Sequence, residues 1–269
     1  MQSKNLCVSA AVALALTAPA AGFAQDDEDD DEIEFAEAHR FFELNNTDGD
    51  LGIHALIDGD PWKRLWIEDI NETRILDVKV RGRLRRQGLT EFFFESAEPT
   101  FDELPPATFF ARFPEGIYDI EGRTLEGEER ESEVEISHAM PAPPNPTVNG
   151  TAVALQCDDE EPGYDAPTVS GDVVIAWDPV MLTHPSLGFP QSSPDISVYN
   201  YQVVVEAELE LPNGDEFGSI LSVILPPDVT EMTIPAEFLE QTDTFKYEVL
   251  AREESWNQTA IESCFELED

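Results

Sequence analysis

Hydrophobic and polar residues alternate along most of the chain with a period of two, which is the pattern of half-buried β-strands. The longest alternation runs from Tyr199 to Leu211, where every second residue from Tyr201 onward is apolar. Gly, Asp, Asn and Pro separate such segments at short intervals, as they do between strands. The pattern predicts an all-β chain. Other strands expected in the second half are 173–177, 217–225, 231–234, 244–251 and 259–265.

The first half has shorter alternating segments at close spacing. Turns are expected at Asp48-Gly49, at 58–60 (Asp-Gly-Asp) and around Asn71, because these residues favour tight reversals. Residues 106–113 predict one short helix with proline in its first turn, and residues 32–44 fit either a helix or a first strand. This many short strands suggests a β-sandwich. The expected strands are 52–57, 64–68, 75–84, 91–95, 117–120 and 134–136.

Three segments divide the chain. Residues 1–24 read as a secretory signal peptide, with a positive Lys4, an uncharged apolar run and small residues before position 25. Residues 25–37 carry nine acidic residues and predict a disordered acidic tether. Four prolines within 141–146 predict a stiff linker. These segments delimit two sandwich domains, at 38–140 and 147–269, and the signal implies a secreted or periplasmic protein.

The negative net charge of the chain limits the kinds of partner that it can bind. The chain carries 57 acidic and 15 basic residues, and its formal charge of −42 becomes −43 when Lys4 is removed. Such a surface repels nucleic acid and anionic membranes. We find no transmembrane segment after the signal peptide. We therefore expect an unidentified protein or glycan ligand at a cell surface.

Three features of the second half resemble a fibronectin type III domain. Trp177 before Asp-Pro is similar to the buried tryptophan of the B strand, and residues 201–206 resemble the C strand. Leu239 and the segment 245–251 resemble the E–F corner and F strand, although Phe245 stands where that family has a tyrosine. The resemblance covers about 120 residues and implies an immunoglobulin-like β-sandwich without a particular function.

The first half resembles the front part of uncharacterised secreted bacterial proteins that also carry a fibronectin type III domain. This resemblance implies no activity. It rests on the segments 47–50, 87–91 and 112–116.

The resemblance also suggests a disulfide. In a seven-stranded fibronectin-like sandwich, the first and last strands run in the same direction, so their ends lie at one pole. Cys157 is expected near the end of the first strand of the second half, and Cys264 near the end of the last. An oxidising compartment favours a bond between them. Two free buried thiols are the alternative.

Residues 46–52, Asn-Thr-Asp-Gly-Asp-Leu-Gly, resemble the opening of a calcium-binding loop. The carboxylates of Asp48 and Asp50 are ligands that Ca²⁺ prefers. Asp60 could join them if the two Asp-Gly turns lay at one end of the sheet. However, the Gly and Glu that complete an EF-hand are missing. A plain hairpin turn is the alternative to a metal site.

Lys79, Arg81, Arg83, Arg85 and Arg86 form a basic cluster. If 75–84 is a strand, alternate members share one face. This face could bind an acidic glycan or another anion. We expect instead that it pairs with acidic residues of neighbouring strands.

No complete catalytic motif is found, so we expect a secreted, non-enzymatic binding, adhesion or matrix protein. A carbohydrate-active hydrolase or its accessory module is one alternative, because 57 acidic residues could easily include the pair of carboxylates that glycosidases use. A calcium-dependent structural protein is another. The histidines show no ligand spacing, and the tryptophans are expected to pack in cores rather than stack on a sugar. These residues are His39, His54, His138 and His184, and Trp62, Trp66 and Trp256.

Overall fold

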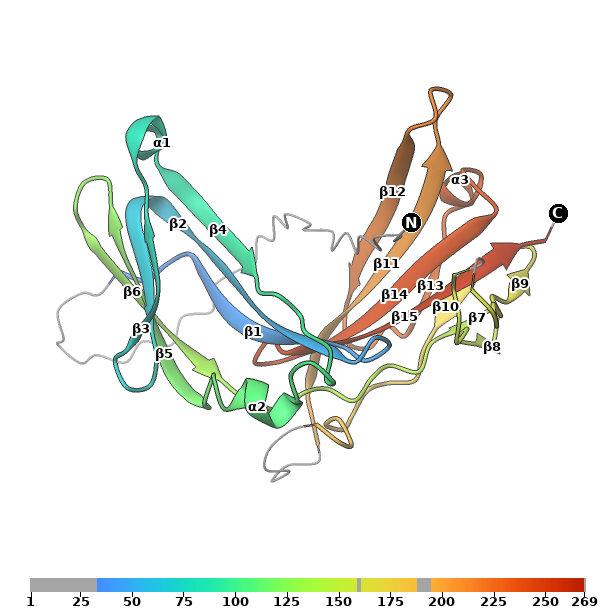
Figure 1. Ribbon diagram of the computed structural model, residues 1–269, viewed down its shortest axis with the longest axis horizontal. Helices are drawn as coiled ribbons and strands as arrows, with labels where there is room; N and C mark the ends of the chain where they lie inside the picture. Colours follow the sequence, from blue (N-terminus) through green and yellow to red (C-terminus); the bar gives the residue numbers. More distant parts are fainter. Residues whose placement is uncertain (1–32, 159–160, 188–194, 269) are drawn as a thin grey trace. The chain divides into compact units, whose positions relative to one another are not determined.

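The computed structural model describes residues 33–158, 161–187 and 195–268. The predicted signal peptide and most of the predicted tether lie outside these ranges. The described residues form mainly strands, which confirms the all-β prediction (Figure 1). None of the helices among them is long and apolar enough to cross a membrane.

One sheet runs through both halves of the chain. Its main path is β12-β11-β14-β15-β1-β2-β5-β6. The halves meet where β1 and β15 pair in parallel, from Glu43 opposite Gln258 to Asn45 opposite Ala260. We call this pairing the junction. The strands of the sheet are β1 (Glu37–Asn45), β2 (Asp50–Glu68), β3 (Arg74–Lys79), β4 (Leu89–Glu95), β5 (Gly116–Thr124), β6 (Glu129–Ile136), β9 (Thr168–Val169), β11 (Val198–Glu210), β12 (Glu216–Leu225), β14 (Thr244–Glu253) and β15 (Gln258–Leu267).

A second sheet, in the order β13-β10-β7-β8, completes the second half. Its apolar residues share one buried cluster with the odd-numbered residues of β11, as the alternation predicted. Trp177 is buried, and its ring lies 5.3 Å from that of Tyr201. Two sheets around one core make this half an immunoglobulin-like sandwich. The elements are β7 (Thr147–Val148), β8 (Thr151–Ala152), β10 (Val174–Ala176), β13 (Glu231–Thr233) and the short α3 (Ala236–Leu239).

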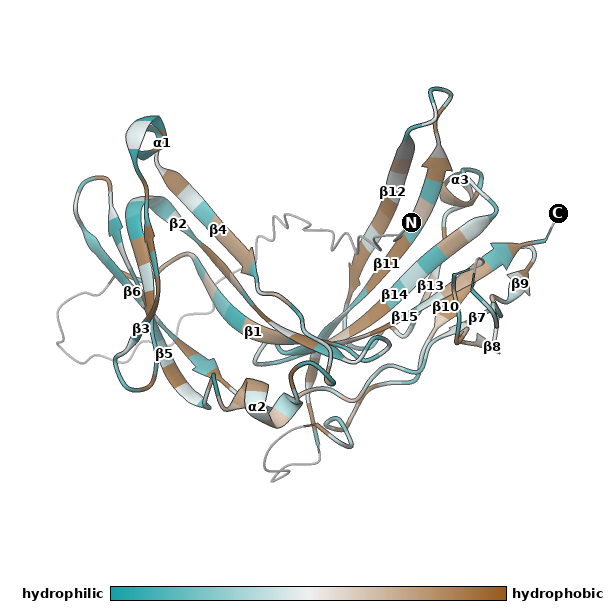
Figure 2. Cartoon of the chain, in the orientation of Figure 1, coloured by the Kyte–Doolittle hydropathy of each residue, from teal (hydrophilic) through white to brown (hydrophobic). Residues whose placement is uncertain are grey.

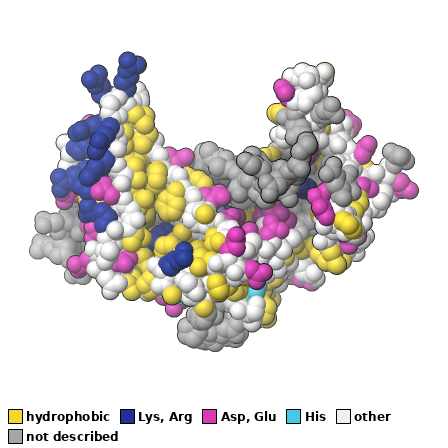
Figure 3. Space-filling model, in the orientation of Figure 1, with side chains coloured by type: hydrophobic (Ala, Val, Ile, Leu, Met, Phe, Trp, Pro, Cys, Tyr) yellow, Lys and Arg dark blue, Asp and Glu magenta, His cyan; other side chains and the backbone are white. Residues whose placement is uncertain are grey.

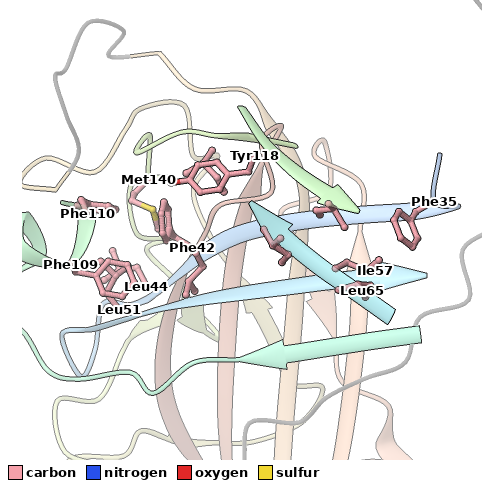
Figure 4. Packing of buried hydrophobic residues seen from close by; sticks show 14 of the residues in the cluster. Phe35, Phe42, Leu44, Leu51, Ile57, Leu65, Phe109, Phe110, Tyr118 and Met140 are labelled. Carbon is pink, nitrogen blue, oxygen red and sulfur yellow. The ribbon is translucent and has the colours of Figure 1, made fainter. Parts of the chain in front are cut away.

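In the first half, the long strand β2 contributes to two layers. Its first part pairs with β1 and β4, and its last part pairs with β3 and β5. The core of this half is one buried cluster that includes Phe42 and Leu44 of β1, Leu65 of β2 and Tyr118 of β5 (Figure 4). Helix α2 (Pro106–Phe110) adds two phenylalanines to this core, close to the helix predicted there.

Figure 2 shows the alternation of polar and apolar residues along the strands. Three predictions in the first half are wrong. Residues 58–60 form no turn, because β2 continues through them with a register shift against β4. The strand predicted at 75–84 ends at Lys79 and is followed by helix α1 (Gly82–Gln87). Phe35, expected in the disordered tether, is buried beneath Gly59 and Gly122, since one large apolar ring outweighs its acidic neighbours.

Candidate functional site at the junction

The candidate site lies on the face of the continuous sheet that is opposite the two cores. Along β1, Phe42 and Leu44 enter a core, so Glu43 between them points to the other face. Glu262 of β15 stands opposite Glu248 of β14 on this same face. Figure 3 shows acidic side chains gathered over the middle of the molecule. The register of the strands thus brings together carboxylates that are remote in sequence.

We define the carboxylate cluster as the acidic side chains that act electrostatically on one another at the junction. Burial, together with the charges of its acidic neighbours, raises the pKa of Asp50 to about 7. Burial is also the largest cause of the raised pKa values of Glu43, Glu248 and Glu262. This repulsion disfavours full ionisation of the cluster. The members are Glu43, Asp48, Asp50, Glu98, Glu206, Glu248 and Glu262.

A buried histidine lies between two members of this cluster. His54 is 4% exposed; its Nε2 lies 3.0 Å from Glu98 Oε1, and its Nδ1 lies 3.7 Å from Glu43 Oε2. Burial opposes the charged imidazole, but the Glu98 hydrogen bond and the two carboxylate charges raise the pKa of His54 overall.

One nitrogen of His54 and one oxygen from each of these glutamates lie within 4.8 Å of one another, close enough to consider a metal ion. However, the carboxylates approach different ring nitrogens. A single ion bound to one nitrogen would therefore require one carboxylate to move. The arrangement fits a charged imidazolium between two carboxylates better than three ligands around one ion.

The structure brings Asp48 and Asp50 together but separates them from Asp60. Asp48 lies in the turn between β1 and β2, where Gly49 has a φ of 68°, and this confirms the predicted Asp-Gly turn. Asp50 begins β2, and its buried Oδ1 has no hydrogen-bond partner among the described residues. Asp60 lies ten residues further along the same extended strand and pairs with Arg130. The condition under which Asp60 could join the site, two turns at one end of the sheet, is therefore not met.

The β1–β2 turn is attached directly to β15. The Thr47 hydroxyl accepts a 2.8 Å hydrogen bond from the Glu262 amide, and Asn45 Nδ2 donates to the Glu262 carboxylate at 2.9 Å. These bonds hold the turn, and with it Asp48 and Asp50, against the second half.

Asn257 fastens the junction from the turn before β15. Its Oδ1 accepts a 2.8 Å hydrogen bond from the Phe42 amide, and its Nδ2 donates to the Ser137 and Ala139 carbonyls at 2.8 and 3.1 Å. Asn257 is 1% exposed. Its buried side chain therefore makes three hydrogen bonds with backbone groups of the first half.

A disulfide joins Cys157 to Cys264, with the two Cα atoms 5.7 Å apart. This is the pairing that the sequence suggested. Cys264 lies in the last strand as expected, whereas Cys157 follows β8 in a loop rather than ending a strand. The bond holds this loop against β15.

A row of rings crosses the junction beside the carboxylates. Trp256 stacks on His39 with ring centroids 3.6 Å apart, and Tyr199 lies 5.7 Å from Trp256. Burial, together with the charge of Arg252, lowers the pKa of His39 to about 4, so this ring is neutral at pH 7. The row continues through Phe41, His54 and Phe93. We call these six residues the aromatic row; Tyr199 is 50% exposed and Phe93 is 40% exposed.

Sequence reasoning missed most of this site. Glu43, Glu98 and Glu262 look like ordinary surface residues in a polar–apolar alternation, and His54 has no second histidine at a ligand spacing. The sequence feature that pointed to the site was the set of polar residues that alternates with the apolar ones along β14 and β15. It could not show that the polar faces of both halves are continuous.

These features define an all-β protein of two sandwich-like halves that share one sheet, with buried ionisable groups at the junction. No family model matches the chain. No curated protein matches it either.

Several solved structures show a distant likeness. A 1.5-MDa bacterial ice-binding adhesin is 10% identical with a TM-score of 0.23, over 88% of this chain and 66% of that one. The BSP domain of a biofilm-associated protein is 12% identical with a TM-score of 0.23, over 87% and 29%. Trypsin-activated α-2-macroglobulin from Escherichia coli is 10% identical with a TM-score of 0.24, over 88% and 16%. The chain thus spans less than two thirds of each, and TM-scores this low indicate neither a shared fold nor a shared function.

Proposed function

We propose that this is an exported, non-catalytic binding protein of a cell surface or extracellular matrix, and that the aromatic row is its binding surface for a glycan. The observation that carries the proposal is the pair Trp256 and Tyr199, whose rings lie 5.7 Å apart, with Tyr199 50% exposed and Trp256 half-buried. Sugar rings stack on such aromatic faces. The disulfide supports export, because such bonds persist in oxidising compartments.

Polar groups beside the rings suit a sugar as well. The Arg252 guanidinium lies 5.3 Å from the centroid of the Trp256 ring. Gln258 accepts a 2.8 Å hydrogen bond from Arg252, and Asn200 and Gln202 accept longer ones at 3.4 Å. These hydrogen-bonding side chains can bind the hydroxyl groups of a sugar while the aromatic rings contact its apolar face.

Intrinsic fluorescence tests this proposal. Trp62, Trp66 and Trp177 are buried, whereas Trp256 is half-buried, so a ligand on the row changes the emission of Trp256 selectively. We expect saturable quenching on titration with soluble cello-, chito- or laminari-oligosaccharides. The signal should disappear in Trp256→Phe.

Tyr199→Ala should weaken the binding at least tenfold. Phe217→Ala provides the matched control, because Phe217 is an equally exposed aromatic residue on β12, outside the row. A wild-type protein that shows no response to any of these sugars, or equal losses in both variants, would contradict the proposal.

A calcium-dependent structural role is the second candidate. The observation in its favour is the buried, unpartnered Asp50 Oδ1 among the carboxylates of Asp48, Glu43, Glu98 and Glu262. Ca²⁺ takes six to eight oxygen ligands and would relieve their repulsion. Calorimetric titration with CaCl₂ should give saturable heat that Asp48→Asn/Asp50→Asn abolishes. Equal heats from both proteins would exclude this role for the two residues.

The hydrolase alternative has less support. Glu43 and Glu98 carry oxygens within 4.8 Å of each other, a separation near that of retaining glycosidases. However, both face the buried His54 rather than an open cleft. Release of reducing ends from the same oligosaccharides, lost in Glu43→Gln, would favour an enzyme.

We also propose that the second half belongs to the fibronectin type III family. The strand order of its two sheets and the buried Trp177 support this assignment.

A further inference from the structure

Helix α1 presents basic residues that the protein itself leaves unpaired. Arg81, Arg83, Arg85 and Arg86 are exposed, and their side chains form no ion pair or hydrogen bond with any described residue. Figure 3 shows a gathering of basic side chains in the region of α1. The predicted cross-strand pairing is therefore wrong for these four. Lys79 does pair with a carboxylate, 3.5 Å away, but this is Asp77 of its own strand β3 and not a residue of a neighbouring strand.

Other basic residues nearby do find acidic partners. Arg64 and Arg74 both bind carboxylates at 2.7 Å, and Arg130 contacts Asp60. In a chain with 57 acidic and 15 basic residues, unpaired arginines do not result from a lack of carboxylates. They result from the chain leaving the sheet after Lys79, so that these arginines lie outside the paired strands.

The backbone holds α1 in this position. Gly82 has a φ of 64° and Gly88 a φ of 83°, both in the left-handed region that favours glycine. A Cβ on Gly88 would lie 2.6 Å from Pro61 Cβ, so the end of α1 rests closely on β2. Arg81 directly before α1 and the three arginines within it are like charges that repel one another. An anionic ligand would remove that repulsion without any rearrangement of the sheet.

We propose that α1 is a docking site for an acidic polysaccharide, bound through its sulfate or carboxylate groups. Guanidinium groups bind both anions in a planar, bidentate manner. A narrow linear polyanion can contact α1 alone. An anionic membrane or a second copy of this chain would bring a broad negative surface against a protein whose charge is −42. This site is separate from the aromatic row and goes beyond the function proposed above.

Binding to dextran sulfate and to alginate at low ionic strength tests this proposal. We expect Arg83→Gln/Arg86→Gln to weaken binding to at least one of them by tenfold or more, and added NaCl to weaken wild-type binding. Arg112→Gln/Lys246→Gln is the matched control, since it removes two exposed basic residues elsewhere and changes the net charge equally. The control should bind within twofold of the wild type.

Comparison of the two polymers distinguishes sulfate from carboxylate as the group recognised. No wild-type binding to either polymer, or an equal loss in the control variant, would overturn the proposal. Stronger binding to poly-glutamate or to phosphatidylglycerol vesicles than to both polysaccharides would also overturn it. Arg83→Gln/Arg86→Gln should keep the wild-type melting temperature, because neither side chain forms an ion pair or hydrogen bond with a described residue.

Discussion

Gly52 makes room for the carboxylate of Glu98. A Cβ placed on Gly52 would lie 2.3 Å from Glu98 Oε1 and 2.7 Å from its Cγ, far inside van der Waals contact. The glycine stands opposite Glu43 in the β1–β2 ladder, so it allows Glu98 to reach His54 across the sheet. The absence of a side chain at one position thus permits the buried Glu43–His54–Glu98 arrangement.

Gly52→Ala should therefore displace Glu98 and lower the free energy of unfolding by about 1–3 kcal/mol. Denaturant unfolding measures the loss. In the Glu98→Ala background the obstructing side chain is gone, and the same glycine substitution should cost much less. Equal costs in the two backgrounds would show that Glu98 does not occupy this place.

Stability should fall as the pH rises from 6.5 to 8.5. Over this range the folded protein holds more protons than the unfolded chain, on Asp50, whose pKa is about 7 instead of 3.8, and on His54, whose pKa is raised above its usual 6.5. A folded state that binds more protons loses stability with rising pH. His39 does not oppose this, because it is neutral in both states above its usual pKa of 6.5.

Melting temperatures in EDTA at constant ionic strength measure this dependence. Asp50→Asn should flatten it, since the amide cannot titrate. A wild-type melting temperature that rises over the same range would contradict the buried-proton argument.

Replacement of Asn257 by Ala should cost about 2–4 kcal/mol, because it leaves the Phe42 amide and two carbonyls without their partner in a buried place. Chemical denaturation provides the measurement. Asn145→Ala is a suitable control, as Asn145 is exposed and makes one long 3.5 Å hydrogen bond. Losses of similar size would mean that Asn257 does not fasten the junction.

Loss of the disulfide should also destabilise the protein. The bond closes a loop between residues 107 positions apart, for which the chain-entropy model gives about 4–5 kcal/mol. Cys157→Ser/Cys264→Ser should unfold at lower denaturant than the oxidised wild type and resemble the reduced one. Mass spectrometry of an unreduced digest should show the two peptides linked.

Added salt should raise the melting temperature. With a formal charge of −42, self-repulsion weakens the compact state, and about 1 M NaCl shortens the Debye length to roughly 3 Å. A thermal melt in 0.05 M and 1 M NaCl tests this. A flat or falling melting temperature would show that the negative charges lie too far apart to matter.

Local patterning predicted most strands of the second half to within two residues. The alternation from Tyr199 to Leu211 became β11, and its predicted apolar face from Tyr201 to Ala207 is buried. Local patterning failed at residues 58–60 and 80–87. At residues 58–60, strand β2 continues through the Asp-Gly pair because it pairs with strands on both sides of it. At residues 80–87, Gly82 and Gly88, which have positive φ, begin and end a short helix where the alternation predicted a strand.

The sequence alone thus determined the all-β class, the acidic surface, the Asp48-Gly49 turn and the pair of cysteines able to bond, because these depend on residue type and short spacing. The tertiary structure decided the site. Parallel pairing of β1 with β15 brings Glu43 to Gln258, 215 positions away, and makes two polar faces continuous. A period-two alternation states which residues share a face of one strand. It contains no information about which strand will lie alongside. The pairing of strands decides this, and it is what brings glutamates that look like surface residues together with an isolated histidine.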